Sequence, residues 1–177
     1  MLVQQVLREI IEILDRLHIP YMLSGSIAFN MYAIPRSTRD IDFVAELKET
    51  DIPHFINAIS GRYYVNEDTV REEVRRKGMF NIVDQQSCYK IDFILLTNHP
   101  YEQLKFSRKK VIVINNQTIW VITLEDLILS KLIWIQRMES DLHKRDIRQL
   151  LENPEADLDY IRHWIFEMNL NTYELVD

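Results

Sequence analysis

The chain has 177 residues, of which 47% are hydrophobic, and it carries a formal net charge of −6. A chain of this length can bury one sizeable core, so a single domain with a helical extension is expected. The acidic balance argues against a protein that coats nucleic acid unaided. Cys88 is the only cysteine, no apolar run reaches membrane-spanning length, and no cationic segment precedes an apolar one at the N-terminus. The sequence therefore predicts a cytoplasmic protein with no membrane contact.

Hydrophobic spacing and turn residues divide the chain into helices and strands. Apolar residues recur at helical spacing from Val3 to Leu17, which predicts an amphipathic helix that stops before His18. The further predicted elements follow in chain order: a strand at 21–23, a helix at 27–32, a strand at 40–44, a helix at 54–59, a short strand at 62–65, a charged helix at 67–77, an antiparallel pair at 79–83 and 89–96, a hairpin of 110–114 with 118–122 around Asn115-Asn116-Gln117, and helices from 123 to about 139 and from 141 to 152. The natural seam between two parts of the chain lies near residue 123.

Two alternating carboxylates mark the second predicted strand. Side chains two apart on a strand share a face, so Asp40 and Asp42 point the same way while Ile41 and Phe43 point into the core. Two like charges side by side are unfavourable unless a cation lies between them, and hard divalent ions prefer oxygen ligands. The strand therefore predicts a site for Mg²⁺ or Mn²⁺.

A tight turn of small residues precedes this strand. The chain has only three glycines, and Gly25 stands where the first strand passes into a helix. Without a Cβ at Gly25, a phosphate could approach the main chain closely. The first amides of the following helix would face that phosphate, and the Ser26 hydroxyl would add a donor. The turn therefore predicts a phosphate site beside the metal strand.

Together these residues resemble the signature of the nucleotidyltransferase superfamily that includes DNA polymerase beta. That signature joins an apolar residue and Gly-Gly or Gly-Ser to an acidic-apolar-acidic-apolar strand, here Gly25-Ser26 and 40–43, although Ser24 replaces the apolar residue directly before Gly25. The resemblance implies an α/β (α+β) fold, a mixed twisted sheet flanked by helices with a helical C-terminal region. It also implies a third carboxylate on a later strand, and Asp92 within the β-prone run 89–96 is the candidate.

The C-terminal helices are similar to those of a bacterial branch related to the AbiEii toxins of toxin–antitoxin pairs, with the resemblance spanning roughly residues 10–152. In that branch a helical lysine and a later aspartate belong to the active site, and by position these are Lys131 and Asp146. The resemblance implies residues 1–122 as a nucleotidyltransferase-like core, with residues 123–177 packed on it in one compact unit. It also suggests RNA as the acceptor and a protein partner in a two-component system.

Basic residues near the carboxylate strand are further candidates for nucleotide binding. Arg36 and Arg39 flank the turn into this strand, where guanidinium groups could reach phosphates. Two local basic clusters could contact RNA, although such runs are usually solvated: Lys105, Arg108, Lys109 and Lys110, and Arg71, Arg75, Arg76 and Lys77.

Each site residue also has a structural interpretation. Asp92 could face solvent on an edge strand, and Lys131 could extend its charge off an apolar helix face. Asp146 could form an ordinary surface pair with its basic neighbours, and Arg36 and Arg39 could simply stay solvated.

The reaction that these residues predict is transfer of a nucleoside monophosphate from an NTP to an acceptor, with release of pyrophosphate. Asp40 and Asp42 would hold the metal ion, and Asp92 would complete a second metal position and help activate the acceptor hydroxyl. Gly25 and Ser26 would cradle the β- and γ-phosphates, and Lys131 would neutralise the leaving group. Two alternatives stay open: an inactive nucleotide-binding module of a protein pair, and a metal-dependent nuclease.

Overall fold

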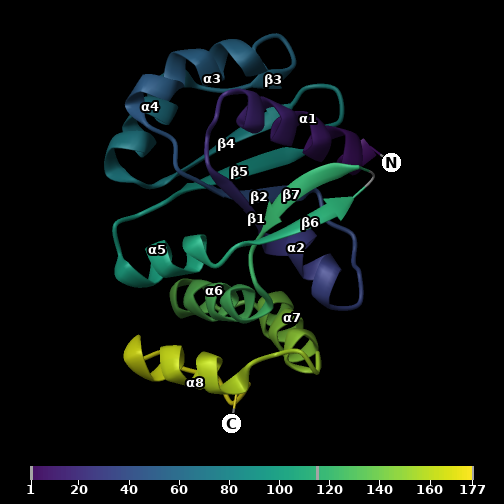
Figure 1. Cartoon of the computed structure of the whole chain (residues 1–177), viewed down its shortest axis with the longest axis vertical. Helices are drawn as coiled ribbons and strands as arrows, with labels where there is room; N and C mark the ends of the chain where they lie inside the picture. The colour runs from purple at the N-terminus through teal and green to yellow at the C-terminus, as the bar shows by residue number, and fades with distance from the viewer. Residues whose placement is uncertain (1, 115, 177) are drawn as a thin grey trace.

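The computed structural model describes residues 2–114 and 116–176, so Asn115 of the predicted hairpin turn lies outside the described residues. Helices and strands are interspersed along this part of the chain (Figure 1). The helices are α1 (Leu2–Arg16), α2 (Gly25–Tyr32), α3 (Ile52–Ile59), α4 (Glu67–Arg76), α5 (Pro100–Ser107), α6 (Leu124–Arg137), α7 (Asp141–Leu151) and α8 (Leu158–Glu167), with a 3-10 turn, η1, at Glu49–Asp51. The strands are β1 (Tyr21–Ser24), β2 (Asp40–Ala45), β3 (Tyr63–Tyr64), β4 (Met79–Asp84), β5 (Lys90–Leu95), β6 (Lys110–Ile114) and β7 (Gln117–Val121).

The strands form one mixed sheet in the order β3-β4-β5-β2-β1-β7-β6. β2 runs parallel to β5 and β1 runs parallel to β7, whereas the other neighbouring strands are antiparallel. This mixed α/β architecture confirms the predicted fold class. It places the predicted metal strand β2 near the middle of the sheet, between β1, which leads into the Gly25 turn, and β5, which carries Asp92.

The two-residue period of the strands separates a buried row from a polar row. Phe43, Phe93 and Phe80 are register partners across β2, β5 and β4, and their rings stack with centroids 5.7 and 5.1 Å apart. Each is at most 2% exposed. Because neighbouring residues on a strand point to opposite faces, Asp42 and Asp92 lie on the other face. Packing of the phenylalanine row thus fixes the register that brings the two carboxylates together.

The C-terminal helices pack next to the start of the sheet. α6 contacts α2, α7 and α8, and α7 also contacts α2, so both helices border the Gly25 turn. Figure 1 shows α6, α7 and α8 gathered at the end of the molecule opposite α3 and α4. Leu127, Ile128 and Leu132 of α6 belong to the same buried cluster as the strands. The division of the chain into residues 1–122 and 123–177 stays a prediction.

Several element ends follow the sequence closely, and two helices were missed. α6 begins after Thr123, whose hydroxyl accepts a hydrogen bond from the amide of Asp126, the capping arrangement expected there. The helices α5 and α8 were not predicted.

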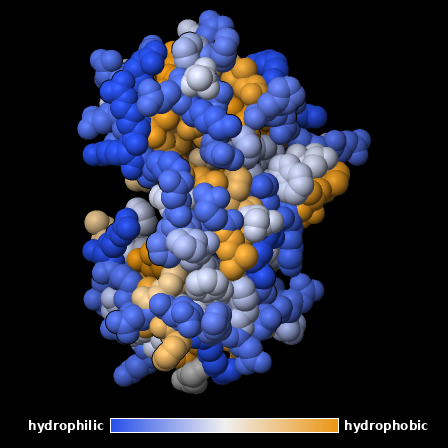
Figure 2. Space-filling view, turned by 60° about the vertical axis from the view of Figure 1, so that its left-hand side comes forward, coloured by the Kyte–Doolittle hydropathy of each residue, from blue (hydrophilic) through white to orange (hydrophobic). Residues whose placement is uncertain are grey.

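Figure 2 shows a face on which hydrophilic residues predominate and hydrophobic residues lie scattered between them. Among the described residues, no helix combines the length and apolar character that a bilayer span requires.

Candidate active site

Gly25 allows the Asp42 carboxylate to lie directly against the turn. Its φ of +59° is in the left-handed region that favours glycine, and an added Cβ would fall 1.9 Å from Asp42 Oδ2. From the sequence alone, this glycine is expected to allow close approach of a phosphate. The structure supplies another reason, because the space beside Gly25 is filled by the carboxylate of β2.

The N-terminus of α2 faces the same carboxylate. The backbone amide of Ser26 donates a hydrogen bond of 3.4 Å to Asp42 Oδ2. The Ser24 side chain makes no capping hydrogen bond to the first turn of α2. The partial positive charge of a helix N-terminus favours anions at this place.

Three aspartates lie on the two central strands β2 and β5, near this turn. Asp42 is the register partner of Ser24 on β1 and of Asp92 on β5. Asp40 begins β2 and is exposed, whereas Asp92 is only 6% exposed. Asp92 Oδ2 lies 2.9 Å from the Lys90 ammonium, and Asp92 Oδ1 is buried without a hydrogen-bond partner among the described residues.

This arrangement makes the ionised carboxylates unfavourable in the absence of a cation. Burial raises the pKa of Asp42, the nearby charge of Asp92 raises it further, and the Ser26 amide only partly offsets both. Burial also raises the pKa of Asp92, against the opposing hydrogen bond from Lys90. A bound cation would relieve both effects.

The donor set fits a hard divalent ion. Neighbouring strands lie about 4.8 Å apart, and Mg²⁺ takes oxygen ligands at about 2.0–2.1 Å, so an ion between Asp42 and a neighbouring carboxylate is sterically reasonable. The unpartnered Asp92 Oδ1 is a further free oxygen. Within residues 2–114 and 116–176, no group of three or more acidic, histidine or cysteine side chains is arranged so that it could hold a metal ion by itself. A metal ion here would therefore need further ligand oxygens from a substrate.

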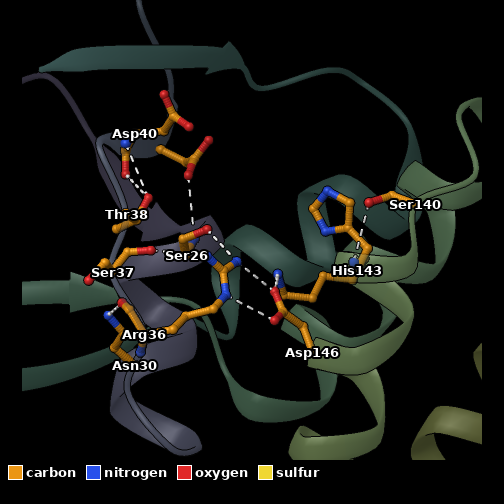
Figure 3. A network of polar contacts seen from close by, with 11 residues as sticks. Ser26, Asn30, Arg36, Ser37, Thr38, Asp40, Ser140, His143 and Asp146 are labelled. Carbon is orange, nitrogen blue, oxygen red and sulfur yellow. Dashed lines mark hydrogen bonds and ion pairs between the residues drawn. The ribbon is translucent and has the colours of Figure 1, made fainter.

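A second polar network joins the Gly25 turn to the C-terminal helices (Figure 3). The Arg36 guanidinium donates from Nε to Asp146 Oδ1 at 3.0 Å and from Nη2 to Asp146 Oδ2 at 2.8 Å. The same Nη2 donates to the Ser26 hydroxyl at 2.9 Å. Lys131 Nζ lies 2.8 Å from Asp146 Oδ2, and both side chains are nearly fully buried. Arg36 from the loop after α2 and Lys131 from α6 thus share the buried carboxylate of Asp146 on α7.

Asn30 of α2 fixes the position of the Arg36 loop. Its side-chain amide donates to the Arg36 carbonyl and accepts from the Arg36 amide, both at 2.9 Å. The Phe29 ring lies below the two cations, 5.4 Å from Arg36 Cζ and 5.5 Å from Lys131 Nζ. These contacts set the guanidinium in one place, between the turn and α7.

The charges of this network are strongly coupled. Burial alone would raise the pKa of Asp146, but hydrogen bonds from Arg36 and Lys131 hold that pKa below its usual range. Burial lowers the pKa of Lys131, with the Asp146 hydrogen bond opposing the shift. Asp146 is therefore ionised, and two cations share its single negative charge. The surplus positive charge lies beside the Ser26 hydroxyl.

Comparisons with known proteins confirm the resemblance to nucleotidyltransferases but do not show the link to the AbiEii branch. The family described as "Nucleotidyltransferase of unknown function (DUF6036)" matches residues 1–177. The chain belongs to this family of nucleotidyltransferases. No curated protein matches it in sequence.

Solved structures of other nucleotidyltransferases share the fold. The solution structure of the antibiotic-resistance factor ANT(2'')-Ia matches with 15% identity, covers 96% of this chain and 95% of that chain, and has a TM-score of 0.62. Its complex with adenylyl-2''-tobramycin matches with 11% identity over 96% and 99%, at 0.59. The lincosamide antibiotic adenylyltransferase LnuA, bound to lincomycin, matches with 12% identity over 82% and 94%, at 0.54. At these identities the likeness concerns the fold.

The structure gathers most of the predicted site residues of this nucleotidyltransferase and separates one. Asp146 and Lys131 are 2% and 4% exposed, so neither is the surface residue that the alternative interpretations described. Arg36 is likewise engaged with Asp146, whereas Arg39 is exposed at the end of the same loop.

The basic clusters are largely committed to intramolecular ion pairs. Lys105 pairs with Glu102, and Arg108 pairs with Asp126. In the other cluster Arg71 pairs with Glu67. Hence these residues provide less free positive charge than their number in the sequence suggested.

Sequence reasoning missed two residues that shape the site. Asn30 had one weak signal, since asparagine is a poor helix former inside a helical run. Lys90 lies two residues before Asp92, so the same-face rule that joined Asp40 and Asp42 also joins Lys90 to Asp92.

Proposed function

We propose that this nucleotidyltransferase moves a nucleoside monophosphate from an NTP to a hydroxyl group of an acceptor. The observation that carries the proposal is the position of Asp42, which is in register with Asp92 on β5 and packs against the Gly25 turn. Carboxylate oxygens and the N-terminus of α2 thereby lie close together. This arrangement would bind a metal-bound triphosphate.

Asp40 and Asp42 are the residues that would hold Mg²⁺ or Mn²⁺ there. A bound divalent ion neutralises triphosphate oxygens and favours attack at phosphorus. The exposed Asp40 can reach an ion that arrives with the nucleotide, and the half-buried Asp42 fixes the inner side of the site. Asp92, the third carboxylate, is in register with Asp42, and its Oδ1 is buried without a hydrogen-bond partner among the described residues.

The basic network is suited to the phosphates. The first amides of α2 and the Ser26 hydroxyl would bind the β- and γ-phosphates, beside the guanidinium of Arg36. Lys131 adds buried positive charge behind this guanidinium, where pyrophosphate would develop. Asp146 would be a positioning residue, because it holds Arg36 and Lys131 in place. Arg39, exposed directly before Asp40, is free to meet the nucleotide from outside.

The proposed step makes one bond and breaks one bond. The acceptor oxygen bonds to the α-phosphorus while the bond from that phosphorus to the oxygen bridging to the β-phosphate breaks. The electron pair of the broken bond leaves on pyrophosphate. The hydroxyl proton passes to Asp92, whose pKa is raised by burial, so that carboxylate is a better base than an exposed aspartate.

The acceptor proposed first is a small hydroxyl-bearing molecule. The neighbours ANT(2'')-Ia and LnuA are described with tobramycin and lincomycin, and this chain shares their fold over most of its length. An RNA acceptor, suggested by the AbiEii resemblance, has weaker support because basic residues such as Lys105 and Arg108 are engaged in ion pairs. The protein partner of a two-component pair is supported only by that resemblance.

The test is incubation with each α-³²P-labelled NTP and Mg²⁺, with aminoglycosides, lincosamides, total tRNA, protein or no acceptor in separate reactions. We expect label on one acceptor class with one preferred NTP, and no label with Asp42→Asn. Shortened RNA or DNA without incorporation would favour the nuclease. Nucleotide binding without either outcome would favour the inactive binding module.

A further inference from the structure

A lysine lies beside the aspartates that form the proposed metal site. Lys90 opens β5 and is the register partner of Asp40 on β2, and its Nζ lies 2.9 Å from Asp92 Oδ2. Lys90 and Asp92 are two residues apart on one strand, so their side chains share a face. A fixed positive charge therefore lies beside the acidic oxygens that form the proposed metal site.

The ion pair gives the two oxygens of the Asp92 carboxylate different surroundings. Oδ2 is neutralised by Lys90, whereas Oδ1 is buried without a hydrogen-bond partner among the described residues. Asp92 is only 6% exposed, so bulk water does not solvate this carboxylate freely. An ion that needed both oxygens of Asp92 would first have to displace the ammonium.

The charges at the edge favour one ion over two. Three carboxylates and one ammonium leave a net charge of −2 on the protein side, which a single divalent cation balances. The Lys90 side chain is 42% exposed, whereas the Asp92 side chain is 9% exposed, so the ammonium compensates a largely buried carboxylate. Lys90 thus supplies one positive charge to the charge balance of the site.

We propose that Lys90 is a built-in cation of the active site, which takes the place of a second divalent ion at Asp92. The protein then binds one divalent ion with the nucleotide, through Asp40 and Asp42. This inference rests on the proposed function, since it requires that these carboxylates bind a metal–nucleotide complex.

The test counts bound Mn²⁺ in the complex with an α,β-methylene NTP, by electron paramagnetic resonance of the free ion. We expect one Mn²⁺ per chain for the parent and two for Lys90→Met, which keeps the length of the side chain and removes its charge. Lys90→Arg, which keeps the charge, should bind one. Lys110→Met is the matched control, because Lys110 is an exposed lysine that opens the edge strand β6, and it should also bind one.

The outcomes separate the two proposals. Two ions in the parent, or one ion in both the parent and a folded Lys90→Met, would overturn the role of Lys90 and leave the proposed function standing. Absence of bound Mn²⁺ and nucleotide in every variant would overturn the proposed function and this inference with it. Circular dichroism of each variant verifies the fold.

Discussion

Arg36 and Asp146 are 110 positions apart in the chain and form a two-pronged ion pair, with N–O distances of 3.0 and 2.8 Å. Lys131 lies 2.8 Å from the same carboxylate. One buried anion therefore holds two cations next to the Ser26 hydroxyl, which Arg36 also contacts. The arrangement keeps positive charge in place before any phosphate arrives, and it ties α7 to the turn between β1 and α2.

Asp146→Asn should destabilise the fold strongly. The substitution leaves the charges of Arg36 and Lys131 without their counter-ion, and breaking a buried pair in this way costs about 3–5 kcal/mol. Thermal unfolding measures the effect, with Asp141→Asn as the control because Asp141 is an exposed acid on the same helix. A melting temperature equal to that of the parent would show that Asp146 does not hold the network together.

Lys131→Met should reduce turnover more than stability. Asp146 retains its two hydrogen bonds from Arg36 after this change, so the loss of stability should be smaller than for Asp146→Asn. Removal of a charge that stabilises the leaving pyrophosphate should lower kcat by about 100-fold. The transfer assay with Lys110→Met as a control measures this, and unchanged kcat in a folded Lys131→Met would remove Lys131 from the reaction.

Gly25→Ala should abolish nucleotide binding, whereas Gly61→Ala should not. Both glycines have positive φ, +59° and +85°, so both alanines carry a similar backbone cost of about 1–2 kcal/mol. Only at Gly25 does the added Cβ meet Asp42 Oδ2, at 1.9 Å, whereas nothing lies within 4 Å at Gly61. Equal nucleotide affinity of the two folded variants, measured by calorimetry, would deny Gly25 its special role.

Asp42→Asn should raise the melting temperature at neutral pH in the presence of EDTA. Burial and then the charge of Asp92 raise the pKa of Asp42, so the folded protein binds this proton more tightly than the unfolded chain and the ionised form costs stability at neutral pH. For a chain of this size, each 1 kcal/mol of relief would raise the melting temperature by about 2–4 °C.

The sign of this effect has a pH signature. The gain should shrink as the pH falls through the raised pKa of folded Asp42, and it should be absent below the unfolded value of 3.8, where the group is neutral in both states. A gain that is absent at neutral pH, or that grows on acidification, would contradict the electrostatic description of the site.

The local part of the site could be predicted from the sequence, because it depends on short-range rules. The two-residue period of a strand is enough to place Asp40 and Asp42 on one face, and a rare glycine before a helical run is enough to mark the turn. The apolar pattern around Asp92 likewise indicated β5. The register that sets Asp42 opposite Asp92 depends on packing of the phenylalanine row, which no local rule specifies.

The long-range part of the site needed the structure. Arg36 has the sequence context of a solvated loop residue, and only the docking of α7 against α2 brings it to Asp146. Lys131 was predicted from family resemblance, but its burial depends on how α6 is covered by neighbouring helices. The helix α8 was not predicted, although Tyr160 and Trp164 are four residues apart on it. Its ten residues mix apolar and polar side chains too closely for the helical spacing to stand out.

The most direct test of the central claim is the affinity of the protein for an α,β-methylene NTP, measured by calorimetry in Mg²⁺ and in EDTA. This measurement requires no acceptor, so it probes the metal–triphosphate site alone. We expect the parent to bind in Mg²⁺ only, and a folded Asp42→Asn to lose at least about 10-fold in affinity, equivalent to about 1.4 kcal/mol. Equal affinities of the parent and Asp42→Asn in Mg²⁺, or parent binding that is unchanged by EDTA, would contradict the account.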